Sequence, residues 1–241
     1  MAEPRERALE LPGLEGALFG EVAPELVERL PAWARRELAD ARPLKAPDVH
    51  RVGDLVLKYF APPRGWARLR TAFPALRTAR RHAELLPVPT PRPVAAVRAA
   101  GRGESLLVSA FVEGPLLGEA WARDPAARAA LPGFLASMRR ARVLHGDLHP
   151  ANLVFDGQGF TLLDVDGVRH RRHRLARVEA SWWALLRIHL GDDEGLRAAH
   201  RAYARLFDED PAPGWARVEA RTDVLLARRT RPVPPGGLGT A

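Results

Sequence analysis

One stretch of the sequence collects residues whose types and spacing suit group transfer. His145, Asp147 and Asn152 lie close together, and Asp164 and Asp166 follow a short distance along the chain. A carboxylate within reach of a hydroxyl can act as a general base, and Asn and Asp oxygens are ligands that Mg²⁺ accepts. The pattern therefore indicates metal-assisted phosphoryl transfer, with Asp147 as the base and Asn152 and Asp164 as metal ligands.

Two short apolar runs are expected to position these side chains. Residues 153–155 and 160–163 flank Asp-Gly-Gln-Gly, whose glycines supply the positive φ that a tight hairpin turn needs. Asn152 precedes the first run and Asp164 ends the second, so we expect a hairpin that brings them to one cleft. Asp166 is an alternative metal ligand, but Asp164 is preferred because it directly ends the strand.

The octapeptide His-Gly-Asp-Leu-His-Pro-Ala-Asn at 145–152, with the hairpin and strand-ending Asp after it, resembles the catalytic and metal-binding loops of the protein-kinase-like superfamily. Within that superfamily it is similar to the aminoglycoside phosphotransferases and to the lipopolysaccharide core kinases. Leu-Leu-Asp-Val-Asp-Gly at 162–167 is closer to the Kdo and heptose kinases, although Gly167 stands where they tend to have Arg. The resemblance covers about residues 49–190. It implies an α+β, protein-kinase-like bilobal fold with a small antiparallel β-sheet N-lobe and a mostly helical C-lobe.

Lys58 is the candidate for binding the phosphates of a nucleotide. Only two of the 37 basic residues are lysines, Lys45 and Lys58, and Lys58 lies in the run 55–60, the second strand of a predicted hairpin with a Gly-Asp turn. The third strand of the kinase-like fold carries a lysine with this role, and the resemblance implies it for Lys58. The alternative is a strand lysine on the solvent face. No full glycine-rich loop precedes Lys58.

The resemblance implies further site residues. A helix expected over 66–86 offers Glu84 as the partner of Lys58, with a surface glutamate as the equal alternative. The backbone of Ala110 and Val112 would hydrogen-bond the adenine, and His145 would orient the catalytic loop. The acceptor would be held by an arginine-rich segment that can bind phosphates or carboxylates bidentately: Arg169, Arg171, Arg172 and Arg174. The alternative is that this segment is only a solvated run of charges.

The whole chain is expected to divide into four parts. Residues 1–41 are expected to form an N-terminal helical extension with a helix over about 24–40, residues 42–113 the N-lobe, residues 114–229 the C-lobe, and residues 230–241 a disordered tail rich in Pro and Gly. In the C-lobe we expect helices over about 124–142, split at Pro132-Gly133, and over 178–190, 194–207 and 215–229. His189 is expected in or beside the core.

Composition limits the partners. The 241 residues include no cysteine, which excludes disulfides and cysteine metal sites, and the net charge of +8 favours an anionic partner. No apolar run approaches the roughly 20 residues that span a bilayer, and no signal pattern begins the chain. We therefore expect a cytoplasmic protein, with peripheral contact to the inner membrane, and we do not expect nucleic acid as a partner.

These observations predict an ATP- and Mg²⁺-dependent phosphotransferase whose acceptor is a hydroxyl of a lipopolysaccharide core sugar, part of an anionic glycolipid. Four alternatives remain open: a small-molecule kinase of the aminoglycoside or choline type, a protein kinase, a nucleotide-binding pseudokinase, and a metal-dependent hydrolase. The hydrolase alternative rests on the metal-ligand character of His145, Asp147 and His149. The sequence leaves the acceptor and the oligomeric state open.

Overall fold

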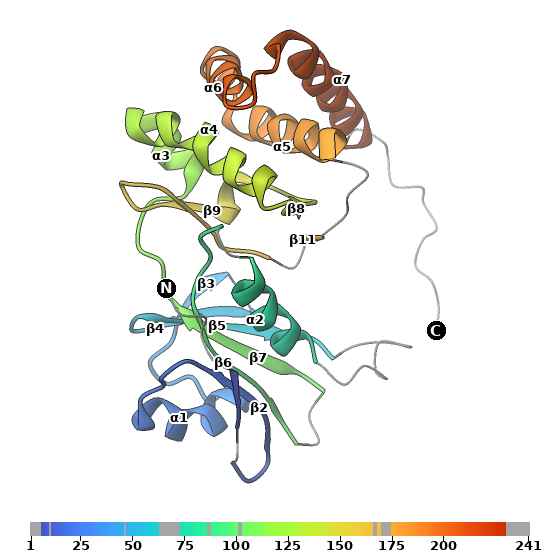
Figure 1. Ribbon diagram of the computed structural model, residues 1–241. Coiled ribbons are helices and arrows are strands. Elements are labelled where there is room, and N and C mark those ends of the chain that lie inside the picture. The colour runs from blue at the N-terminus through green and yellow to red at the C-terminus, as the bar shows by residue number, and fades with distance from the viewer. Residues whose placement is uncertain are drawn as a thin grey trace. The chain divides into compact units, whose positions relative to one another are not determined.

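The computed structural model describes residues 6–9, 11–45, 47–62, 73–85, 88–100, 103–165, 168–169 and 175–229. These residues form an α+β structure with two compact units (Figure 1). The first unit consists of Met1–Gly114 and Thr161–Asp166, and the second consists of Pro115–Phe160 and Gly167–Ala241. The expected tail over 230–241 lies outside the described residues.

The first unit is built on a seven-stranded sheet of order β1-β2-β6-β7-β5-β4-β3, and each neighbouring pair runs antiparallel. Hairpins join β4 to β5 and β6 to β7. Gly53 has a φ of 57° in the turn between β4 and β5, which confirms the predicted Gly-Asp hairpin. The strands are β1 (Glu6–Ala8), β2 (Leu14–Phe19), β3 (Arg42–Lys45), β4 (Val49–Val52), β5 (Leu55–Phe60), β6 (Pro93–Ala99) and β7 (Ser105–Ala110).

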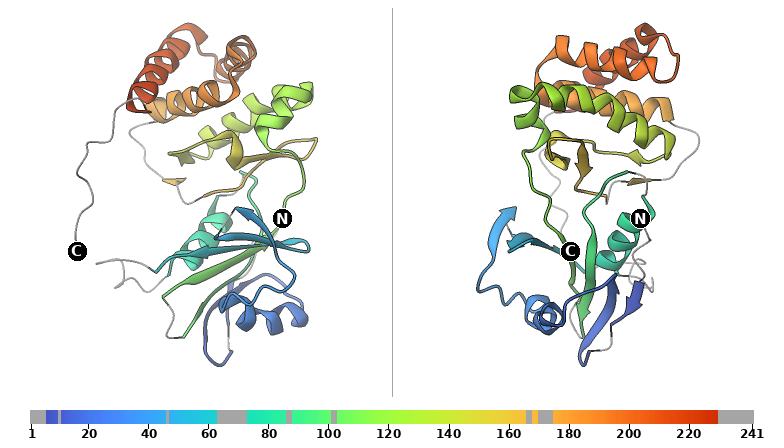
Figure 2. Two further views of the ribbon diagram at one scale, coloured as in Figure 1. Left: turned by 180° about the vertical axis from the view of Figure 1, so that it is seen from behind. Right: turned by 60° about the vertical axis from the view of Figure 1, so that its left-hand side comes forward.

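Two helices cover opposite faces of this sheet (Figure 2). Side chains alternate between the faces of a strand, so Leu106 and Val108 of β7 pack with α1 (Pro24–Ala34), while Leu107 between them packs with α2 (Pro74–Glu84). Both helices have proline at their first position, where a missing N–H costs no hydrogen bond. Each face of the sheet therefore has its own hydrophobic core.

The N-terminal 41 residues contain more than the helix that the apolar pattern indicated. β1 and β2 are strands of the sheet, with β2 pairing β6, and α1 ends at Ala34 rather than near residue 40. β1 is exposed throughout, so it has no alternation of apolar and polar residues that would predict a strand.

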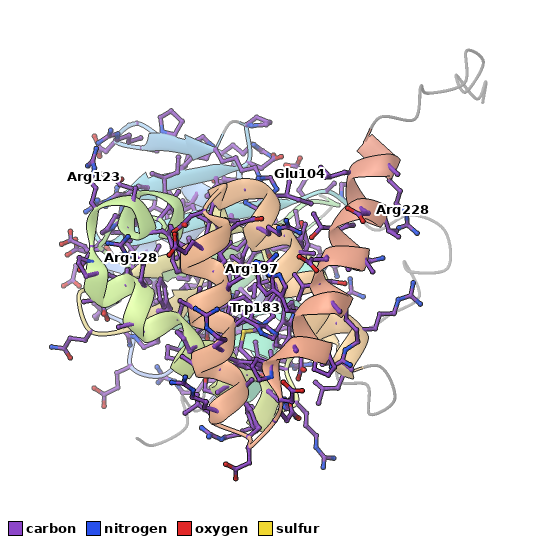
Figure 3. The ribbon with its side chains drawn as sticks, turned by 90° about the horizontal axis from the view of Figure 1, so that it is seen from above. Glu104, Arg123, Arg128, Trp183, Arg197 and Arg228 are labelled. Atoms are coloured by element: carbon purple, nitrogen blue, oxygen red, sulfur yellow. The ribbon has the colours of Figure 1, made fainter. Side chains whose placement is uncertain are left out.

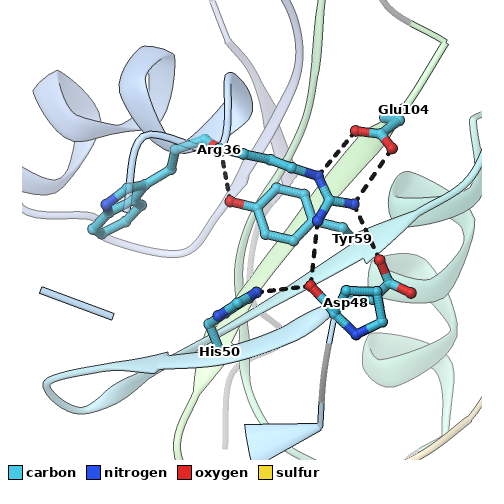
Figure 4. A network of polar contacts seen from close by, with 7 residues as sticks. Arg36, Asp48, His50, Tyr59 and Glu104 are labelled. Atoms are coloured by element: carbon cyan, nitrogen blue, oxygen red, sulfur yellow. Dashed lines mark hydrogen bonds and ion pairs between the residues drawn. The ribbon is translucent and has the colours of Figure 1, made fainter. Parts of the chain in front are cut away.

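A network around Arg36 ties the segment after α1 to the sheet (Figure 4). Arg36 has a φ of 65° and donates to Glu104 at 3.1 Å and to Asp48 at 3.1 Å. Its guanidinium lies over the ring of Tyr59, 4.2 Å from the centroid. The buried hydroxyl of Tyr59 donates to the carbonyl oxygen of Trp33 at 2.7 Å. These contacts fix the C-terminal end of α1 and the residue Arg36 after it against β5 and against the residues just before β4 and β7.

The second unit is mostly helical. Its buried side chains include Trp182 and Trp183 on α5, Leu131 and Leu135 on α4, and Leu196 on α6. In the part of the chain that the structure describes, none of the helices has the length and apolar character of a bilayer-crossing segment. The helices are α3 (Leu117–Arg123), α4 (Pro125–Arg140), α5 (Leu175–Leu190), α6 (Asp193–Arg205) and α7 (Pro211–Arg229).

Two helical features of this unit differ from expectation. α4 is a single helix that continues through Pro132 and Gly133, so the predicted split is wrong. Pro132 and its neighbours Leu131 and Phe134 are buried, and this packing offsets the hydrogen bond that proline removes. The short helix α3 was not predicted, because its N-terminus at Leu116 has no capping side chain.

Tyr59 provides a test of the core around Arg36. Burial raises its pKa to about 12 from an ordinary value of about 10. Because the folded state favours the neutral hydroxyl, this contribution to stability is complete below pH 10 and is lost as the pH rises toward 12. The only other tyrosine is Tyr203, whose pKa is also raised by burial. An ultraviolet titration of the native protein should therefore show no tyrosinate near pH 10.

The matched variant is Tyr59→Phe, which should remove the absorbance step near pH 12. The same titration in urea should show both tyrosines ionising near pH 10, as in an unfolded chain. A tyrosinate step near pH 10 in the folded wild type, absent in Tyr59→Phe, would contradict the buried position of this hydroxyl.

Candidate functional site

Lys58 lies in the middle of β5, between β4 and β7. Leu57 and Tyr59 face the core beneath α1, so alternation puts Lys58 on the face that α2 covers, together with Phe60. The lysine is therefore not on an uncovered solvent face, and its side chain is 28% exposed. Its ammonium also lies 5.0 Å from the centroid of the Phe60 ring.

Lys58 forms an ion pair with Asp164. The lysine Nζ donates to Asp164 Oδ1 at 3.2 Å, which joins two residues far apart in the sequence. Asp164 belongs to the same unit because the backbone around it is held there: the amide of Leu162 donates to the carbonyl oxygen of Pro89 at 2.9 Å. An ion pair with a carboxylate that is 42% exposed contributes on the order of 0–1 kcal/mol to folding stability. Its main effect is therefore to hold the two charged groups next to each other.

Asp147 and Asn152 belong to one closed loop in the second unit. The Asp147 carbonyl oxygen accepts from the backbone N–H of His149 at 3.0 Å and from the Nδ2 of Asn152 at 3.1 Å. The Asn152 amide group is thereby oriented, which leaves its Oδ1 as an acceptor. The Asp147 side chain is exposed, and its carboxylate has no hydrogen-bond or ion-pair partner among the described residues. A free carboxylate on a fixed loop suits a general base.

His145 sits beneath this loop, with 1% of its surface exposed. Its Nδ1 accepts from the backbone N–H of Asp147 at 3.2 Å, and its carbonyl oxygen accepts from the indole Nε1 of Trp182 at 2.7 Å. His145 therefore positions Asp147 rather than reaching the surface itself. The contribution of Trp182 was not predicted, because the helical spacing of α5 shows that this residue is buried but not which backbone oxygen it meets.

His149 orients the other end of the loop. Its Nδ1 accepts from the backbone N–H of Ala151 at 3.1 Å, so the side chain caps the 3₁₀ turn η2 (Pro150–Asn152) that carries Asn152. The ring packs on His189 of α5, with centroids 3.9 Å apart. His189 is exposed and contacts this loop, rather than packing in or beside the core as expected. A polar residue directly before Pro150 is the signal that could have revealed the cap.

The hairpin after Asn152 consists of β9 (Leu153–Phe155) and β10 (Phe160–Leu162), which form a two-stranded sheet. Gly157 has a φ of 90°, but Gly159 does not have positive φ, so one glycine and not two meets the expected requirement. Asp156 closes the turn by accepting from the amides of Gln158 and Gly159, and these hydrogen bonds lower the pKa of its carboxyl. β8 (Leu144–His145) pairs with β11 (Val168–Arg169).

The two predicted adenine contacts differ in what they offer. The amide of Ala110 donates to the carbonyl oxygen of Arg92 at 2.9 Å, so Ala110 has only its carbonyl oxygen for a ligand. The next amide, that of Phe111, donates to the carbonyl oxygen of Asp54 at 2.8 Å. Val112 follows the end of β7, and its N–H donates to no backbone oxygen of the described residues. An acceptor and a donor two residues apart match the pair of groups on an adenine edge.

The predicted magnesium ligands have suitable chemistry, since Asn152 offers an amide oxygen and Asp164 a carboxylate. Among the described residues, no group of three or more His, Asp or Glu side chains lies close enough together to hold a metal ion. The hydrolase alternative rests on the metal-ligand character of His145, Asp147 and His149 and would need further His or Asp ligands in a second cluster. Both imidazoles use Nδ1 to accept from backbone amides, so a metal could bind them only through Nε2. The hydrolase alternative stays a prediction.

Several predicted site residues fall outside what the structure describes. Glu84 ends α2 and Arg169 ends β11, but only their backbones are described. The remaining four lie in undescribed stretches: Asp166, Arg171, Arg172 and Arg174. Their predicted roles therefore stay predictions.

Trp182 and Trp183 form a matched pair for testing the support of the loop that carries Asp147 and Asn152. Both indoles are buried on α5, but only Trp182 donates a hydrogen bond; within the described residues the Nε1 of Trp183 meets no acceptor (Figure 3 shows Trp183). Trp182→Phe leaves the His145 carbonyl oxygen buried without its donor, which should cost about 1–3 kcal/mol more than Trp183→Phe in urea unfolding. Equal costs would mean that the hydrogen bond contributes nothing beyond ring packing.

His149 should act through its cap. His149→Ala removes the acceptor for the Ala151 amide and should cost about 1 kcal/mol of unfolding free energy, whereas His149→Asn keeps a capping acceptor and should recover most of it. Amide hydrogen exchange at Ala151 would show the same order, fastest in the alanine variant. Equal exchange in both variants would place the support of η2 elsewhere.

Comparisons with known proteins identify no family for the chain. No family model matches, and no curated protein matches significantly. Among solved structures, the chain is similar to a high-resolution crystal structure of WbdD, with 17% identity and a TM-score of 0.46 over 81% of this chain. A second structure, described as the bifunctional kinase-methyltransferase WbdD, gives 16% identity and a TM-score of 0.46 over 85%. The chain spans 46% of the length of either WbdD chain.

Proposed function

We propose that the protein is an ATP-dependent phosphotransferase with a protein-kinase-like bilobal fold, which moves the γ-phosphate of ATP to a hydroxyl group. The observation that carries the proposal is the contact of Lys58 with Asp164 at 3.2 Å. The sequence selected these two residues separately, one as the phosphate-binding cation and one as a ligand for the metal on the phosphates. An ammonium and a carboxylate that meet at one point suit a metal–phosphate complex, because each binds one component of it.

The proposed reaction uses the residues as follows. Lys58 binds phosphate oxygens of ATP, and Asn152 and Asp164 would hold Mg²⁺, which when bound neutralises charge on the phosphates. Asp147 accepts the proton of the acceptor hydroxyl as the new oxygen–phosphorus bond forms and the bond to ADP breaks. His145 and His149 keep the loop of Asp147 and Asn152 in place through the hydrogen bonds described above. Ala110 and Val112 would accept from and donate to the adenine.

The acceptor that we propose is a lipopolysaccharide core sugar, a Kdo or heptose residue of an anionic glycolipid, reached by peripheral contact with the inner membrane. The net charge of +8 supports an anionic acceptor and disfavours a polycationic aminoglycoside. A choline-type substrate, a protein and nucleotide binding without catalysis are the other outcomes of the tests below.

The two lysines allow a test of ATP binding that needs no acceptor. An amine-acylating reagent should modify Lys58 and Lys45, and Mg²⁺-ATP should protect Lys58 at least about tenfold, because a bound phosphate occupies its ammonium. Lys45 is exposed on β3 and is the internal control. Mass spectrometry of the two peptides gives the ratio. Equal protection of both lysines, or of neither, would contradict phosphate binding by Lys58.

Catalysis is tested by ATP consumption with Mg²⁺ across Kdo-lipid A, heptosylated core, aminoglycosides and a generic protein. Asp147→Asn should lower turnover about 100-fold or more, since it removes the base, while ADP affinity stays unchanged. The control is Asp54→Asn, an exposed turn carboxylate that should leave turnover unchanged. The acceptor that raises wild-type turnover names the substrate class. Tight ATP binding with no Asp147-dependent turnover on any acceptor would instead indicate a pseudokinase.

A further inference from the structure

Three arginines of the second unit come together where α5 packs against α7. Arg177 lies on α5, and Arg221 and Arg228 are separated by two turns of α7, which puts them on one side of that helix. Burial and the positive charges of Arg177 and Arg228 together lower the pKa of Arg221. Arg221 is therefore close enough to both Arg177 and Arg228 to be repelled by their charges. Figure 3 shows Arg228 on α7.

This cluster lacks the carboxylates that other arginines of the unit have. Arg187 pairs with Asp193 at 2.6 Å, Arg197 with Glu219 at 2.5 Å, and Arg123 with Glu119 at 2.6 Å. None of Arg177, Arg221 and Arg228 forms an ion pair with a described carboxylate, and the electrostatic neighbours of Arg221 are both cations. The repulsion within the cluster is thus not balanced by the described part of the chain.

Arg221 is held in place despite this repulsion. Its Nε donates to the hydroxyl of Ser181 at 2.9 Å, and that buried hydroxyl donates in turn to the carbonyl oxygen of Arg177 at 2.9 Å. Within the described residues only the Nε of the guanidinium donates a hydrogen bond, so there its two Nη groups keep their donors for a ligand. A guanidinium that is fixed with free, paired donors is prepared for bidentate binding of an oxyanion.

The position of Arg177 adds a second unfavourable charge. It lies in the first turn of α5, which contains no acidic residue, and the N-terminal end of a 16-residue helix favours negative charge. A single anion among the three side chains would relieve both the mutual repulsion and the wrong sign at the helix end. We propose that Arg177, Arg221 and Arg228 bind a phosphate group carried by the acceptor; the term acceptor rests on the proposed function.

The direct test measures binding of inorganic pyrophosphate to the full chain by calorimetry at constant ionic strength. Arg177→Gln, Arg221→Gln and Arg228→Gln should each raise the Kd about tenfold or more, the value of one charge-assisted hydrogen bond. Arg128→Gln is the control, because Arg128 is an exposed arginine on α4 and the loss of charge is identical (Figure 3). It should change the Kd less than about twofold. Equal effects in all four variants would overturn the site.

Arg177 and Arg228 are exposed, so their variants should fold even if Arg221→Gln, which loses the Ser181 contact, does not. ADP affinity should stay unchanged in all of them, which separates this site from Lys58. Sedimentation with phosphatidylcholine vesicles, with and without phosphatidic acid, distinguishes the source. Binding to the phosphatidic acid vesicles that needs the three arginines assigns the phosphate to a lipid headgroup, and pyrophosphate binding alone assigns it to a soluble molecule.

Failure of this site and failure of the proposed function give different results. Pyrophosphate binding that needs the three arginines, without Asp147-dependent turnover, would keep the anion site and reject the phosphotransferase. Turnover that needs Asp147, with pyrophosphate affinity and acceptor KM unchanged in all three variants, would keep the phosphotransferase and reject the site.

Discussion

The contact between Lys58 and Asp164 sets a constraint on the path of the chain. After the first unit ends at Gly114, residues 161–166 must return to it so that Asp164 can meet a lysine of the central strand β5. The return depends on the β9–β10 hairpin and on the hydrogen bond from Leu162 to Pro89. A partly exposed ion pair contributes too little energy to direct this path. Packing and backbone hydrogen bonds therefore fix the path, and the ion pair forms as a result.

Elements that are determined by nearby residues could be predicted from the sequence. Strands that depend on pairing with distant residues were harder to predict. The β4–β5 hairpin and α5 follow from turn glycines and helical spacing, signals that lie within a few residues. β1 joins the sheet through pairing with β2 while every one of its side chains is exposed, so its own residues do not distinguish a strand from a loop. In α4 a local signal is misleading. Pro132 predicts the end of a helix, but burial of the surrounding side chains keeps the helix continuous through it.

The candidate site divides in the same way. Lys58, Asp147, Asn152 and Asp164 could be selected from the sequence because each side chain type is required by the chemistry it would perform. The hydrogen bonds to backbone groups around the site could not be predicted. The indole of Trp182 donates to the carbonyl oxygen of His145, and the amide of Ala110 donates to the carbonyl oxygen of Arg92. Any residue can supply a backbone oxygen, so neither hydrogen bond requires a particular residue type as the acceptor. Only the folded structure identifies which residue accepts.

α5 connects the two functions that we assign to the second unit. Trp182 supports the loop of Asp147 through His145, and the neighbouring residue Ser181 holds Arg221 and contacts the carbonyl oxygen of Arg177. Because both residues belong to one helix, the positions of the proposed base and of the proposed anion site both depend on α5. The proposed phosphate site and the proposed base would thus keep a fixed spacing, because both belong to one unit. Lys58 and Asp164, for which we propose phosphate and metal binding, belong to the first unit.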